Sequence, residues 1–221
     1  MDRTIKVTGK GRVSVAPDMI RLHITQSETE KTYETAVKAS AEQKKTITDA
    51  FSKLGFKKED LKTLSFDVSA QYESYQARDK SWKQRLVGYR FVHNMKLEFP
   101  RDNELLGKAL GTMAAIKGEP EFSIQYFVKD VEAVKNKLLA NAVKDSSEKA
   151  GALTKAAGVK LGEIVHIDYS WGEMDISIAP VAPMMLRSAK MPVGECNSVS
   201  IDIEADDIKV EDTVTIVWEI K

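Results

Sequence analysis

Histidine and cysteine are the side chains best suited to hold a metal ion or to act as a nucleophile with its base. The sequence has three histidines and one cysteine, at His23, His93, His166 and Cys196. The histidines fall in three different predicted strands, whereas a metal site needs them to converge with carboxylate or thiolate ligands. Cys196 has no histidine at motif spacing, which argues against a catalytic thiol. We therefore predict no metal site, and we interpret His93 as a hydrogen-bonded histidine on an apolar strand face.

Glycines and acidic pairs could also carry chemistry. Gly9-Lys10-Gly11 does not match a phosphate-binding loop. The glycines of such a loop lead into a helix N-terminus, whereas these lie among strand residues. A bulge or a close approach of another backbone is the expected reason for them. The acidic pairs fall at predicted turns or element ends, where solvation explains them: Glu59-Asp60, Asp206-Asp207 and Glu211-Asp212. No cofactor site and no enzyme active site are predicted.

Two segments suggest binding to another protein chain. Residues 72–85 are expected to form a loop that mixes aromatic and cationic side chains, a composition found in partner surfaces and in single-strand nucleic-acid platforms. Residues 180–192 are apolar and rich in methionine in what should be an irregular, proline-containing loop, which either packs on its own domain or inserts into another subunit. The candidate contact residues are Tyr72, Tyr75, Trp82, Arg85, Met184, Met185, Leu186 and Met191.

The hydrophobic periodicity predicts the elements that position these segments. Alternating runs indicate strands, the first two of which, 4–15 and 20–24, we expect to form a hairpin. Helical stripes closed by glycine indicate helices. Further strands are expected near 64–72, 89–99, 122–128, 164–169, 199–203 and 214–220, and the last two are expected to form a C-terminal hairpin. Helices are expected near 33–54, 102–118 and 130–158, with Asp102 and Asp130 as the N-caps of the second and third.

The order of elements indicates an α+β fold. From residue 20 to residue 128 it is strand, helix, strand, strand, helix, strand, the split β-α-β unit of ferredoxin-like folds. We predict antiparallel sheets around this core, with extra N- and C-terminal hairpins and one long helix. The chain is expected to be a single unit of residues 1–221, or two intertwined subdomains formed by 20–128 and by 1–19 with 129–221.

Composition limits the partners. Lysine and arginine total 33 residues and aspartate and glutamate also total 33, so no overall field favours nucleic acid or an anionic membrane. No apolar run approaches the roughly 20 residues of a membrane-spanning helix. The N-terminus enters a strand pattern with no signal sequence, which predicts a cytoplasmic protein, or a periplasmic or secreted one if a signal has been removed.

The sequence resembles the SIMPL-domain proteins, long described as a domain of unknown function. The resemblance covers almost the whole chain and depends on the order of Val7-Thr8-Gly9-Lys10-Gly11, Pro17-Asp18, Leu54-Gly55, Thr63, Gly88-Tyr89, Ala156-Ala157-Gly158 and Leu161-Gly162. A mammalian member associates with a Pelle-like kinase, and bacterial members are mostly exported and are linked to stress tolerance and self-assembly. The family has no established catalytic residues, so the resemblance implies none here.

Three hypotheses follow from the sequence. The first is a non-enzymatic homo-oligomer or protein-binding module that makes its contacts through residues 72–85 and 180–192. A role in the stress response is part of this hypothesis. The second is an enzyme with a site built from scattered residues near His93. The third is a small-ligand carrier with a groove between the sheet and the long helix.

Overall fold

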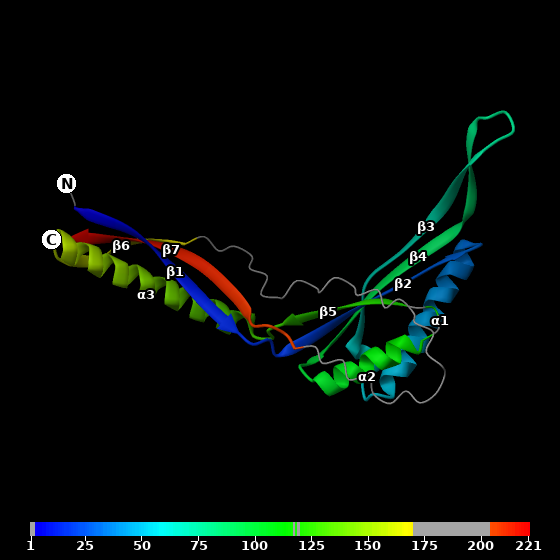
Figure 1. Ribbon diagram of the computed structural model, residues 1–221, viewed down its shortest axis with the longest axis horizontal. Coiled ribbons are helices and arrows are strands. Elements are labelled where there is room, and N and C mark those ends of the chain that lie inside the picture. The colour runs from blue at the N-terminus through cyan, green and yellow to red at the C-terminus, as the bar shows by residue number, and fades with distance from the viewer. Residues whose placement is uncertain (1–2, 117, 119, 170–203) are drawn as a thin grey trace. The chain divides into compact units, whose positions relative to one another are not determined.

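The computed structural model describes residues 3–116, 118, 120–169 and 204–221 (Figure 1). These residues fall into two compact units, one made of 3–18, 127–169 and 205–221 and the other of 19–126 with residue 204. The elements in chain order are β1 (Thr4–Val15), β2 (Met19–Glu30), α1 (Tyr33–Ser52), a short 3-10 turn (Lys58–Asp60), β3 (Leu61–Gln76), β4 (Trp82–Pro100), α2 (Asn103–Ala114), β5 (Glu121–Phe127), α3 (Val131–Ala157), β6 (Leu161–Asp168) and β7 (Ile208–Ile220).

The unit of residues 19–126 is built on a four-stranded sheet in the order β3-β4-β2-β5. Strands β2 and β4 are antiparallel, with Leu22 opposite Leu97, and alternate side chains of both strands are buried. This period of two puts one apolar row against the helices. The buried side chains of α1 and α2 complete the core, which includes Ile20, Leu22, Ile24, Ile47, Phe51, Phe91, Met95, Leu97, Leu106 and Met113.

The other unit places α3 against a three-stranded sheet in the order β1-β7-β6. Gly9 and Gly11 of β1 lie directly under the helix. A Cβ atom on Gly9 would lie 2.0 Å from the carbonyl oxygen of Ala142, and one on Gly11 would lie 2.1 Å from that of Leu138. The expectation of a close backbone approach is confirmed, and its reason is that α3 leaves no room for a side chain.

Both expected N-caps and the glycine end of α3 are confirmed, whereas α1 ends at Ser52 and α2 at Ala114, each before the expected glycine. The Asp102 side chain accepts hydrogen bonds from the backbone N–H groups of Glu104 and Leu105, and Asp130 accepts one from Ala133. Gly158 ends α3 in the left-handed conformation. These caps satisfy backbone groups that have no partner inside the helix, which is why both aspartates were recognisable from the sequence.

The expected N-terminal hairpin is wrong. Strand β1 pairs with β7 from Thr4 opposite Glu219 to Val15 opposite Ile208, whereas β2 pairs with β4. The turn after Pro17 therefore leads from one sheet to the other, and the Asp18 side chain accepts a hydrogen bond of 2.8 Å from the backbone N–H of Lys129. Alternation identifies a strand and its buried face, but it does not identify the partner strand.

The α+β class and the long helix are confirmed, since α3 has 27 residues. The ferredoxin-like assignment stays a prediction. The first strand of the expected C-terminal hairpin, 199–203, lies outside the described residues, and β7 pairs with β1 and β6.

The contact between β1 and α3 gives a test of packing. We expect Gly9→Ala to lower the free energy of unfolding by at least about 2 kcal/mol, because the new methyl group overlaps the backbone of α3. Urea unfolding followed by circular dichroism measures the change. The matched control is Gly151→Ala within α3, where no atom lies within 4 Å of the added Cβ and the helix should gain up to about 1 kcal/mol. Equal stability of the two variants would contradict the packing argument.

Candidate binding surface

The paired ends of β3 and β4 form a two-stranded ribbon. Strand β2 pairs with β4 only up to Tyr89, whereas β3 continues to pair with β4 out to Gln76 opposite Trp82. We call residues 71–88 the hairpin arm; Figure 1 shows it running past the ends of β2 and α1. The expectation that residues 72–85 form a loop is therefore wrong. Cross-strand hydrogen bonds need no apolar core, so a polar composition did not prevent strand formation.

A defined turn closes the hairpin arm. The backbone N–H of Ala77 donates to the carbonyl oxygen of Ser81 at 2.8 Å, and that of Lys80 donates to Ala77 at 2.9 Å. The Asp79 side chain accepts from the backbone N–H of Ser81 at 3.0 Å, and Lys80 adopts φ +63°. These contacts fix the register in which the two strands leave the turn.

One face of the arm carries three large, exposed apolar side chains among polar ones. Tyr72 lies opposite Leu86. Trp82 is four positions from Leu86 in the same strand, and because side chains alternate along a strand, it shares their face. Trp82 is 73% exposed, Tyr72 61% and Leu86 47%. A register shift beside Tyr72 leaves Val87 as an extra, exposed residue. Exposed apolar groups gathered in this way mark interaction surfaces.

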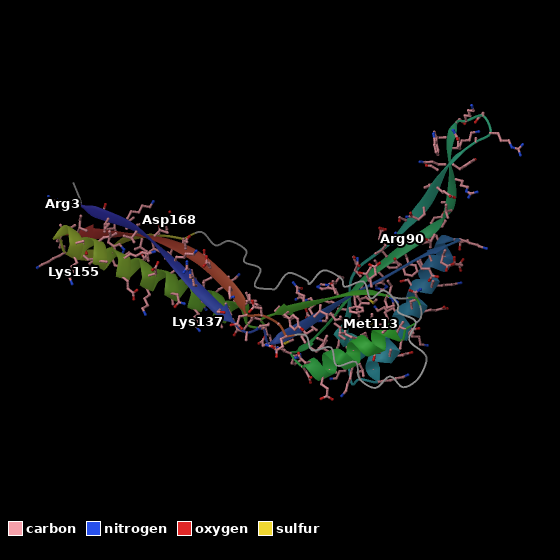
Figure 2. The ribbon with its side chains drawn as sticks, in the orientation of Figure 1. Arg3, Arg90, Met113, Lys137, Lys155 and Asp168 are labelled. Atoms are coloured by element: carbon pink, nitrogen blue, oxygen red, sulfur yellow. The ribbon has the colours of Figure 1, made fainter. Side chains whose placement is uncertain are left out.

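The other face of the arm is polar. Arg85 donates to the Glu73 carboxylate at 2.8 and 3.1 Å, and its guanidinium carbon lies 5.8 Å from the centre of the Tyr75 ring. Figure 2 shows side chains standing on both sides of the ribbon. The structure thus brings the first four candidate contact residues into one arm and divides them between its faces, Tyr72 and Trp82 on one and Tyr75 and Arg85 on the other.

Sequence reasoning missed Leu86 and Val87, although an apolar pair before Gly88 was visible. Their role depends on the pairing of Leu86 with Tyr72, which the sequence does not show. The remaining candidates, Met184, Met185, Leu186 and Met191, lie outside the described residues, as does Cys196.

His93 lies in the core of the same unit, 6% exposed. Its Nδ1 atom is 3.0 Å from the Ser40 hydroxyl and its Nε2 atom is 2.9 Å from the Thr63 hydroxyl, to which Lys44 donates at 3.0 Å. Two hydroxyl partners suit a neutral imidazole, which has one donor and one acceptor nitrogen. Burial lowers the pKa of His93 from its ordinary value, and the charge of Lys44 acts in the same direction.

His23 and His93 do not converge. His23 lies opposite Lys96, on the sheet face away from His93, with its Nε2 atom 3.2 Å from Gln125, and His166 belongs to the other unit. Within the described ranges, no three histidine, cysteine, aspartate or glutamate side chains are placed to hold a metal ion.

Among the described residues no helix combines the length and the apolar composition needed to cross a bilayer.

Comparison with known protein sequences identifies the family of this chain. The model of the SIMPL family, described as a protein of unknown function (DUF541), matches residues 5–218. The chain belongs to the SIMPL family. Two SIMPL-chain relatives carry the name 26 kDa periplasmic immunogenic protein. One, from Brucella abortus (strain S19), is 26% identical over 218 residues, which are 98% of this chain and 84% of the relative. The other, from Brucella melitensis biotype 1, is 25% identical over the same shares of both chains.

The buried His93 gives this SIMPL protein a predicted pH dependence. The unfolded chain takes up a proton on this imidazole near pH 6.5, whereas the folded chain does so at lower pH. The stabilisation is therefore complete above about pH 6.5 and is lost as the pH falls through that value toward the folded-state pKa. We expect His93→Gln to flatten the fall in unfolding free energy between pH 7.5 and pH 5, measured by urea unfolding.

The matched control for this measurement is Ser40→Ala. It removes one hydrogen bond to the imidazole but keeps the titrating ring, so stability should fall at every pH while the slope persists. A wild-type slope in His93→Gln would refute the assignment of the pH dependence to this residue.

Proposed function

We propose that this SIMPL protein is a non-enzymatic module that assembles with further copies of itself through the hairpin arm. The observation that carries the proposal is the apolar face formed by Tyr72, Trp82 and Leu86 on a ribbon that β2 does not cover. Isolated two-stranded hairpins are only marginally stable in water, so an arm of this kind gains stability from a surface that covers it.

The energetics favour an apolar contact between protein chains. Each of the large apolar side chains on this face would contribute about 2 kcal/mol if fully buried. Tryptophan and tyrosine are also the residues that dominate binding energy in protein interfaces. Because positive and negative side chains balance at 33 each, long-range attraction to nucleic acid does not compete with this contact.

The segment of residues 180–192 remains part of the proposal as a second contact, through Met184, Met185, Leu186 and Met191. The proposal treats the two units as subdomains of one SIMPL unit, because the family match of residues 5–218 spans both. The relatives are named periplasmic, and we propose that compartment in place of the cytoplasm expected from the N-terminal residues. A role in stress tolerance stays a prediction.

The alternative of an enzyme near His93 has less support. A Ser–His pair is present, but Ser40 is 2% exposed and His93 6%, so a substrate has no path to either. Neither residue lines the open groove between α1 and α2. A carrier site between the sheet and α3 is also disfavoured, because the backbones are in contact at Gly9 and Gly11.

The test of assembly is native mass by light scattering across a dilution series. We expect a discrete oligomer for the wild type and at least a tenfold shift toward monomer for the double variant Trp82→Ser with Leu86→Ser, because most of the apolar face is removed. Leu153→Ser is the matched control, since it removes an exposed leucine of α3 and should leave the mass unchanged. A wild-type monomer, or an equal shift in the control, would reject the proposal.

A further inference from the structure

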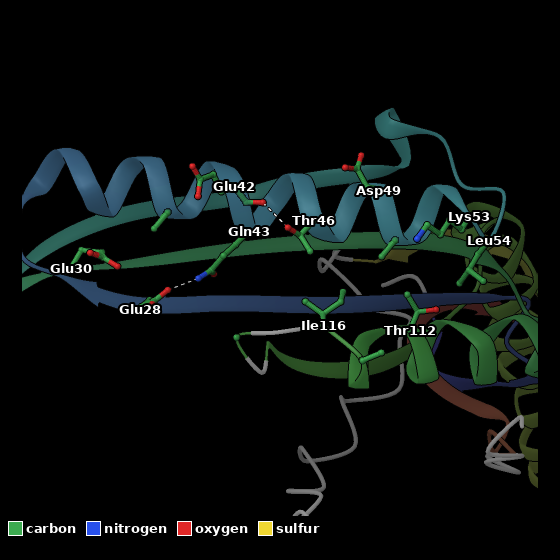
Figure 3. A pocket seen from close by; sticks show the side chains of 14 residues that line it. Glu28, Glu30, Glu42, Gln43, Thr46, Asp49, Lys53, Leu54, Thr112 and Ile116 are labelled. Atoms are coloured by element: carbon green, nitrogen blue, oxygen red, sulfur yellow. Dashed lines mark hydrogen bonds between the residues drawn. The ribbon is translucent and has the colours of Figure 1, made fainter. Parts of the chain in front are cut away.

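An open groove of about 980 Å³ lies between α1 and α2, beside the end of β2. Figure 3 shows α1 along one side, the end of α2 along the other, and β2 between them. Its volume is within the range of ligand-binding clefts. The groove lies entirely in the unit of residues 19–126 and is separate from the hairpin arm.

The groove has an excess of negative charge. Glu28, Glu30, Glu42 and Asp49 line it, and among the described lining residues Lys53 is the one cation. Among the described residues none of these four carboxylates forms an ion pair; Glu28 accepts a hydrogen bond from the neutral Gln43 side chain. Elsewhere on the same helices acidic residues do have cationic partners, as in Glu34 with Lys38 and Glu104 with Lys108.

The rest of the lining is apolar. Leu54 and Ile116 contribute large side chains, and Ala39, Ala50 and Ala115 contribute small ones. The Thr46 and Thr112 hydroxyls donate to carbonyl oxygens of their own helices, at 3.0 and 2.8 Å. The part of each side chain that remains for a bound molecule to contact is therefore its methyl group. Figure 3 shows Glu28, Glu30 and Glu42 toward one end of the groove and Leu54 toward the other.

The arrangement of carboxylates and apolar side chains in the groove indicates which kind of molecule it can bind. The carboxylates are not grouped as metal ligands, since no described set of three converges on one point. Separated carboxylates above an apolar floor complement an extended molecule in which cationic and apolar groups alternate. A short peptide segment with lysine or arginine beside leucine has that character.

We infer that the groove between α1 and α2 binds a short basic, apolar peptide segment of another protein. Its cationic side chains lie among the four carboxylates, and its apolar side chains lie on Leu54, beside the nearly buried Ile116. Complementary charge speeds the encounter and sets the orientation, while the apolar contacts supply affinity. Because exposed ion pairs are screened, binding weakens as the salt concentration rises.

The experiment titrates the full-length protein into a fluorescein-labelled Leu-Lys-Leu-Lys-Leu-Lys peptide and follows anisotropy. We expect saturable binding at low salt, and we expect Glu42→Gln with Asp49→Asn to raise the dissociation constant by about tenfold. The matched control is Glu34→Gln with Glu104→Gln, which removes the same amount of charge from positions on α1 and α2 outside the groove and should leave the constant within about twofold of wild type. Circular dichroism checks that both doubles are folded.

Each other outcome overturns the inference. No binding by the wild type, or equal weakening in the two double variants, would mean that the groove does not recognise the peptide. Displacement by spermine at the concentration of the unlabelled peptide would assign the site to small polyamines instead. The variant Trp82→Ser with Leu86→Ser should bind the peptide as the wild type does, so failure of the arm proposal and failure of this one are distinguishable.

Discussion

The pairing of β4 with β2 is the constraint on which the unit of residues 19–126 depends. In this register Phe91, Met95 and Leu97 all point to the helices, together with Leu22 and Ile24 from β2. A slip by one residue would turn every one of these side chains to the other face of the sheet. The same register places His93 between Ser40 and Thr63, and it leaves the far end of β4 paired with β3 alone, as the hairpin arm.

The two candidate surfaces of this unit differ in how the fold makes them. The hairpin arm exists because β3 and β4 are longer than the strand beside them, so it is held by its own ladder and turn. The groove exists because α1 and α2 leave part of the β2 end uncovered. An apolar ribbon and an acidic groove suit different partners, and the distance in sequence between their residues allows each to be changed alone.

Much of the fold could be predicted because its signals are local. Alternation marked the strands, and Asp102, Asp130 and Gly158 marked helix ends. The pairing of β1 with β7 could not be predicted, since it joins residues about two hundred positions apart and alternation carries no partner information. Glu42, Thr46, Asp49 and Lys53 recur at helical spacing, but that pattern is equally typical of a solvated helix face; only α2 on the opposite side makes it a groove.

The pairing of β1 with β7 also has a consequence for the order of events during synthesis on the ribosome. Residues 19–126 form a continuous stretch that can fold as a unit once it has emerged. The sheet of the other unit needs β7 between β1 and β6, so it closes only after β7 has been synthesised and has emerged. Until then β1 and β6 have unpaired edges, and the apolar side chains of β1 and α3 lack the part of their core that β7 contributes. A nascent chain that lacks β7 therefore has strand edges that are open to pairing with other chains.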